Sequence, residues 1–214
     1  MCRSCKSLCH LCTLVLMVFA TVGTASASPI LSAVTTLGGA PVADFEGFAE
    51  GTLIAGQYAG VTFSQDDLGT PMIDNVPFLF GYDQTSGEGV LTGSQTGGAP
   101  FPTVAGLVLD FAAPVSAVEW FLSDTGPLGV YTVSAFGAGN VLLESFVATP
   151  ENYVGFTRAS ADIFRVTFDS DVVNDAFAMD DLRFQAAVPE PASLLTILSA
   201  IGGLAAFGRR RTKK

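Results

Sequence analysis

Beyond its first twelve residues the chain contains no cysteine and no histidine. The four cysteines, Cys2, Cys5, Cys9 and Cys12, and the single histidine, His10, all lie in the N-terminal leader. This absence excludes disulfides, Ser-His and Cys-His nucleophile pairs and the usual zinc sites from the rest of the chain. The cysteines form two C-x-x-C pairs only three residues apart, too close for a zinc fold, and we expect the leader to be removed.

Lysine is also missing between residues 28 and 187. This body carries three basic residues, Arg158, Arg165 and Arg183, against nineteen acidic ones, a net charge of −16. Nucleic acid binding is excluded, because nothing is available to neutralise the phosphates. Most of the acidic residues are expected to keep the protein soluble. A few clustered carboxylates could instead hold Ca²⁺, which takes oxygen ligands.

The first 27 residues have the pattern of a secretory signal peptide. Two basic residues precede an apolar run over residues 11–22, and residues 25–27 are the small residues that a signal peptidase requires. We predict cleavage before Ser28. The body, residues 28–187, would then lie outside the cytoplasm.

The last 27 residues contain three parts in a fixed order. The tetrapeptide Val188-Pro189-Glu190-Pro191 is followed by an uncharged apolar run over residues 192–208 and a basic tail, 209–214, which begins with Arg209, Arg210 and Arg211. The two prolines favour an extended tetrapeptide. At about 1.5 Å per residue, a helix over the apolar run barely crosses a bilayer, and the basic residues would hold the C-terminus in the cytoplasm.

These C-terminal residues resemble the PEP-CTERM sorting signal of exosortase substrates. The resemblance implies that an exosortase, a membrane protease-transpeptidase, recognises residues 188–191 and removes the transmembrane helix, 192–208. The protein would be anchored transiently in the inner membrane and then pass to the cell surface or the extracellular polysaccharide. The alternative is an ordinary C-terminal membrane anchor that follows two prolines.

The body reads as β throughout, because glycine and proline interrupt it at short intervals and no long stretch keeps a helical period. We expect an all-β domain, a two-sheet antiparallel β-sandwich of jelly-roll type. The predicted strands are 42–45, 60–64, 106–111, 117–122, 129–136, 141–147, 152–156, 163–168 and 177–184. Residues 65–105 are expected to form loops, with a short strand at Pro77–Tyr82.

Three local patterns give sharper predictions. The run 136–140 has the chemistry of a hairpin turn. Trp120 shares the parity of its apolar neighbours and is predicted to be buried. In Ile163–Phe168, strict alternation predicts that Phe164 and Phe168 both point inward.

Two acidic segments indicate one candidate metal site. Asp44-Phe45-Glu46-Gly47 lies at the first predicted strand, and Met179-Asp180-Asp181-Leu182 lies in the last. The first and last strands of a sandwich are often neighbours, so we expect the two segments to lie side by side. Adjacent carboxylates repel unless they are solvated or bridged, so Glu46, Asp180 and Asp181 could hold a structural Ca²⁺. The alternative is a solvated acidic strand edge.

The same pair of segments resembles that of carbohydrate-binding jelly rolls with a structural Ca²⁺. Phe177 and Met179 share one face of the last strand, whereas Leu182 and Phe184 have the opposite parity. If all four are buried, the strand needs an extra residue at 180–181, which a β-bulge supplies.

Sugar binding requires exposed aromatic rings, and Tyr82 is the candidate ligand-binding residue. A glycosidase would need two facing carboxylates, and no motif selects a pair. The sequence therefore predicts an exported, non-catalytic surface or matrix protein, structural or adhesive in exopolysaccharide, and not an enzyme. The alternative is a carbohydrate-binding module with its own sugar specificity.

Overall fold

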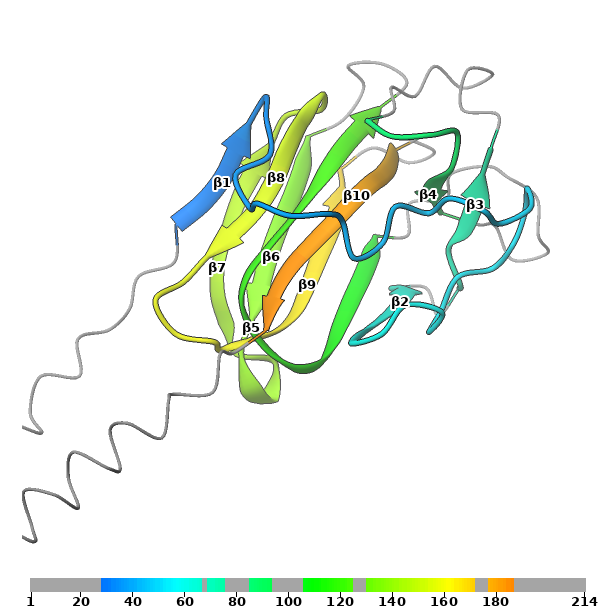
Figure 1. Cartoon of the computed structure of the whole chain (residues 1–214). Coiled ribbons are helices and arrows are strands. Elements are labelled where there is room, and N and C mark those ends of the chain that lie inside the picture. Colours follow the sequence, from blue (N-terminus) through cyan, green and yellow to red (C-terminus); the bar gives the residue numbers. More distant parts are fainter. Residues whose placement is uncertain are drawn as a thin grey trace, which may run out of the picture.

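The computed structural model describes residues 28–66, 69–75, 85–93, 106–124, 130–171 and 177–186. These residues form an all-β, antiparallel domain (Figure 1). Its strands are β1 (Ser28–Ser32), β2 (Val61–Gln65), β3 (Met72–Asp74), β4 (Val90–Thr92), β5 (Leu107–Asp124), β6 (Tyr131–Phe136), β7 (Leu142–Ala148), β8 (Asn152–Thr157), β9 (Ile163–Ser170) and β10 (Phe177–Ala186).

Several predictions concern residues outside these ranges. They are the signal peptide, the strand Pro77–Tyr82 and the whole sorting signal, with its tetrapeptide, its helix 192–208 and Arg209–Arg211. Within the described ranges, no helix has the length and apolar character needed to cross a membrane.

Strand β5 organises the sheet. Its first part pairs with β2 and β9, and its last part pairs with β8 and β10. Between Asp110 and Val115 its register against β9 shifts, and the strand bends there (Figure 1). Because β5 belongs to both halves, the strands form one ten-stranded sheet, in the order β3-β4-β10-β5-β9-β6-β7 with β1, β8 and β2 attached beside this path. The antiparallel all-β class is confirmed, and the predicted strands 106–111 and 117–122 are one continuous strand.

The main apolar core lies between two halves of the sheet, one that pairs with the first part of β5 and one that pairs with its last part. The ring of Phe146 in β7 lies 5.2 Å from that of Phe156 in β8, although β7 and β8 are not neighbours in the sheet. Trp120 is fully buried, as predicted, and its ring lies 6.2 Å from that of Phe168. The large rings therefore join the two halves.

The prediction for Phe164 is wrong. Phe168 is fully buried, but Phe164 is 38% exposed, and its neighbour Ile163 is buried instead. The cause lies in β5, which carries extra residues between Asp110 and Val115, where it bends. Phe164 lies in the part of β9 beside this bend, where the side chains of β9 no longer alternate between the two faces of the sheet.

Pairing also decides which short segments become strands. The predicted strand 42–45 forms only an isolated bridge at Ala43, whereas β1 pairs along its whole length with β8. Strands β3 and β4 lie inside residues 65–105, where we expected loops. With three residues each, they are too short to show a periodic pattern. The predicted hairpin is confirmed: β6 and β7 pair across a 3-10 turn, η2 (Ala138–Asn140), in which Gly139 and Asn140 are left-handed.

Candidate functional site: a buried carboxylate network

Strand β10 carries the paired aspartates at a β-bulge. Its register against β5 shifts between Asp180 and Arg183, where two residues of β10 face one residue of β5. Asp181 adopts a left-handed conformation, with φ of 51°. The extra residue lets Met179 and Leu182 both join the apolar core despite their odd spacing. The predicted bulge is therefore confirmed.

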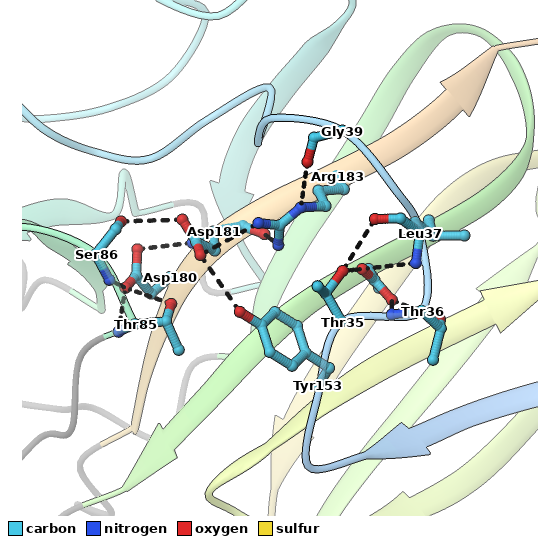
Figure 2. A network of polar contacts seen from close by, with 11 residues as sticks. Thr35, Thr36, Leu37, Gly39, Thr85, Ser86, Tyr153, Asp180, Asp181 and Arg183 are labelled. Carbon is cyan, nitrogen blue, oxygen red and sulfur yellow. Dashed lines mark hydrogen bonds and ion pairs between the residues drawn. The ribbon is translucent and has the colours of Figure 1, made fainter.

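Asp180 is fully buried, and hydrogen-bond donors surround its carboxylate (Figure 2). Its Oδ2 accepts from the backbone N–H and the hydroxyl of Thr85, both at 2.9 Å, and from the backbone N–H of Ser86 at 3.1 Å. Its Oδ1 accepts from the backbone N–H of Asp181 at 2.7 Å. Burial raises the pKa of Asp180 and the charge of Asp181 adds to the rise, while the donors from Thr85 and Ser86 oppose it.

Asp181 binds a second set of donors, which Figure 2 shows beside the first. The Ser86 hydroxyl donates to Oδ1 at 2.9 Å, and the Tyr153 hydroxyl donates to Oδ2 at 3.3 Å. The guanidinium of Arg183 lies 3.4 Å from Oδ2 and also donates to the carbonyls of Asp181 and Gly39. It sits 5.5 Å from the centre of the Tyr153 ring. A buried ion pair satisfied in this way ties segments that are distant in sequence to β10.

Thr85 and Ser86, which donate to Asp180 and Asp181, begin a short loop, residues 85–89. Glu46 contacts the other end of this loop. Ala43 and Leu182 form an antiparallel bridge, so the two acidic segments lie side by side, as predicted. The carboxylate of Glu46 accepts from the backbone N–H of Glu88 at 3.2 Å and from that of Gly89 at 2.9 Å. The three predicted carboxylates therefore converge on one short loop from its two ends.

Two glycines allow this loop, residues 85–89, to approach the chain so closely. A Cβ on Gly87 would lie 2.0 Å from the carboxyl carbon of Glu46, and one on Gly89 would lie 2.4 Å from the carbonyl oxygen of Phe45. The sequence predicted a loop here but not its contacts with the acidic segments. Its signal was the run Thr-Ser-Gly-Glu-Gly, which offers two hydroxyl donors and two residues without a side chain.

Within the described part of the chain, no group of three or more acidic, cysteine or histidine side chains is placed to hold a metal ion. The oxygens of Asp180 and Asp181 face N–H and O–H donors. Ca²⁺ takes six to eight oxygen ligands, so these donors would have to turn away to admit it. The arrangement seen is one of hydrogen bonds, and Ca²⁺ binding by Glu46, Asp180 and Asp181 stays a prediction.

A further buried carboxylate, which sequence reasoning also missed, lies in β5. Glu119 is fully buried, and its Oε1 accepts from the hydroxyl of Thr35 and, at 3.0 Å, from the N–H of Leu37. Its Oε2 accepts from the N–H of Thr36 at 3.0 Å and from the hydroxyl of Thr36 at 2.7 Å. The signal was a lone charge inside an apolar strand, because an unpaired buried carboxylate is too costly to persist.

The carboxylates of this network hold other segments of the chain in position. Each of its carboxylates accepts hydrogen bonds from another segment of the chain. Burial raises the pKa of the adjacent Tyr58 to about 12, with the charges of Asp44 and Glu46 adding to the rise, so this hydroxyl stays protonated at neutral pH. The predicted sugar-binding residue, Tyr82, lies outside the described residues.

Comparison with known proteins gives a distant structural likeness and no sequence family. No family model matches the chain, and no curated protein matches it. A solved structure of TmCBM61 in complex with beta-1,4-galactotriose is similar to it with a TM-score of 0.38 and 12% sequence identity, over 62% of this chain and 92% of that chain. A likeness this distant says nothing about what the present chain binds.

Proposed function

We propose that this chain is an exported, non-catalytic protein that an exosortase processes, with a structural or adhesive role at the cell surface or in extracellular polysaccharide. The observation that carries the proposal is the order of the C-terminal segments: the tetrapeptide 188–191, the apolar run 192–208 and the basic residues from Arg209 to Arg211. Each part alone is common in proteins, but the three together match what a sorting protease needs.

The positions of the described strands fit this proposal. Strand β1 begins at Ser28, directly after the predicted signal peptidase cut, and β10 ends at Ala186, two residues before Val188. Removal of either end would therefore leave every described strand intact.

The buried network supports a non-catalytic role. Its carboxylates accept hydrogen bonds from loops and strands of the same domain, so they hold the fold instead of facing a substrate. We also infer a sandwich of jelly-roll type, because the sheet bends at β5 and brings Phe146 of one half against Phe156 of the other. A rigid sandwich suits a structural component of a matrix.

The processing claim can be tested in the native host by measuring the mass of the mature protein. We expect a species that begins at Ser28 and has lost residues 192–214. Glu190→Ala should leave the uncut form in the inner membrane fraction, while the control Glu144→Ala, an acidic change on β7, should be processed normally. Normal release of the Glu190→Ala protein would contradict exosortase recognition.

Sugar binding by the domain itself is the second candidate. The observation that favours it is the anchoring of Thr85 and Ser86 on Asp180, which fixes the chain three residues after Tyr82. A glycan array probed with the mature protein should then show one sugar class, and Tyr82→Ala should abolish the signal. Phe164→Ala, at an exposed ring on β9, is the control. An array without any signal would rule this candidate out.

A further inference from the structure

Both ends of the folded domain lie at the same end of the sheet. The register sets Ser28 of β1 opposite Thr157 of β8, Thr157 opposite Ala117 of β5, and Ala117 opposite Gln185 of β10. These four strands lie side by side (Figure 1). Because neighbouring strands are about 4.8 Å apart, the start of β1 and the finish of β10 are separated by only about 14 Å.

We call this end of the domain the terminal end. It also contains the bend of β5 at residues 112–114 and the β6–β7 turn at residues 137–141, because Phe136 pairs with Arg165 close to that bend. No charged residue occurs in residues 136–143, and Val141 and Leu142 at the turn are 61% and 57% exposed.

Two arginines belong to the terminal end, and both are neutralised there. Arg158 pairs with Asp162, and Arg165 pairs with Asp110. The terminal end therefore presents exposed apolar side chains together with balanced charges.

The opposite end of the domain is acidic. Asp66 follows β2, Glu151 precedes β8 and Asp171 follows β9, and all three side chains are exposed. Within residues 28–187, the only arginine besides the two at the terminal end is Arg183, which is buried against Asp181. The net charge of the body is thus concentrated away from the two chain ends.

The length of the connecting chain limits how the domain can sit on a membrane. From Ala186 to Ala192, where the apolar run begins, the chain spans at most about 20 Å. Strand β10 has ten residues, so the two ends of the domain are about 30 Å apart. An anchored domain cannot turn its opposite end to the bilayer, because the connecting chain is too short to run back along it.

We propose that, while residues 192–208 anchor the chain, the terminal end rests on the lipid bilayer with Val141 and Leu142 at the headgroups. Anionic lipids repel the acidic opposite end of the domain but do not repel the neutral terminal end. This orientation rests on the proposed function, because it needs the anchor. It places the tetrapeptide at the membrane surface and turns the acidic loops outward.

The test uses the two ends of the same hairpin. Val141 lies at the terminal end, and Val130, which is 46% exposed, precedes β6 at the opposite end. The chain from Ser28 onward contains no cysteine, so Val141→Cys or Val130→Cys gives a single site for a fluorophore. Each labelled chain, with its leader removed and its C-terminal segment intact, is reconstituted into vesicles of phosphatidylethanolamine and phosphatidylglycerol. A fraction of the lipids carries a nitroxide on the headgroup.

We expect the label at position 141 to lose most of its fluorescence to the nitroxide lipids and the label at position 130 to lose little. Equal quenching at both positions, or stronger quenching at 130, would overturn the orientation. Flotation of the vesicles measures separately whether the chain is anchored in the membrane. Chains that fail to float would overturn the proposed anchoring and the orientation with it, whereas chains that float with equal quenching overturn the orientation alone. Leu142→Cys and Glu151→Cys form a second pair, should either valine variant fail to fold.

Discussion

Replacing Glu119 with glutamine should release the N-terminal strap, residues 33–39, from the sheet. In the wild-type protein the two carboxylate oxygens face four donors, two hydroxyls and the backbone N–H groups of Thr36 and Leu37. An amide keeps only one of these oxygens. Whichever way it turns, its NH₂ group meets one of the two backbone N–H groups, and that N–H is left buried without an acceptor.

The size of the effect follows from the hydrogen bonds that change. An unsatisfied buried donor costs about 1–3 kcal/mol, and the remaining bonds weaken because their acceptor is no longer charged. The amide is easier to bury, which offsets part of this loss. We therefore expect the strap to lose about 2–4 kcal/mol of attachment free energy. Since about 1.4 kcal/mol is a factor of ten, its opening should become about 30 to 1,000 times more frequent.

Hydrogen exchange read by mass spectrometry measures this opening directly. Amides of residues 33–39 should exchange faster in the Glu119→Gln protein, while those of β6 and β9 should change little. Glu144→Gln is the matched control, because the Glu144 carboxylate on β7 makes no hydrogen bond within the described residues. If residues 33–39 exchange at the wild-type rate in Glu119→Gln, the strap is held by something other than this carboxylate, and the reasoning is refuted.

Three further predictions test the fold and the network. Gly155→Ala should destabilise the domain by about 2–4 kcal/mol in urea unfolding, because its Cβ would lie 1.9 Å from the carbonyl oxygen of Val118. Gly38→Ala, where a Cβ meets nothing within 4 Å, should change stability little, and equal effects would contradict the packing argument. Burial raises the pKa of Asp180. The contribution of Asp180 to the free energy of unfolding is therefore greatest below about pH 4, and it is lost as the pH rises through the raised pKa. The stability of the wild type relative to Asp180→Asn should therefore fall from pH 4 towards neutrality, and a flat difference would show that Asp180 titrates normally. If Ca²⁺ binds, an excess over its Kd should add about 2–4 kcal/mol to the stability of the mature protein, and an identical melt with chelator would disprove it.

The strand pattern of the second half of the chain could be predicted because it depends on neighbouring residues. Alternation and turn chemistry located β6 to β10 and the turn at Gly139 and Asn140. A change of parity between Met179 and Leu182 was enough to predict the bulge, since side chains on a strand alternate strictly unless a residue is inserted. Each of these inferences needed only a few consecutive residues.

The rest could not be predicted, because it depends on partners that are distant in the chain. The donors to Glu119 lie 82 to 84 residues before it, and those to Oδ2 of Asp180 lie 94 to 95 residues before it. Phe164 is exposed because β5 bends beside it, which no pattern within β9 reveals.

By itself, the sequence determined an acidic body without cysteine or histidine, built of short strands and flanked by two segments with the pattern of export signals. These are properties of composition and local period, and they do not depend on how the strands pair. Only the tertiary structure decided that three predicted carboxylates converge on residues 85–89 and that β1 begins where β10 ends. Both results follow from strand register, which is set by packing across the whole sheet and not by the residues of any one segment.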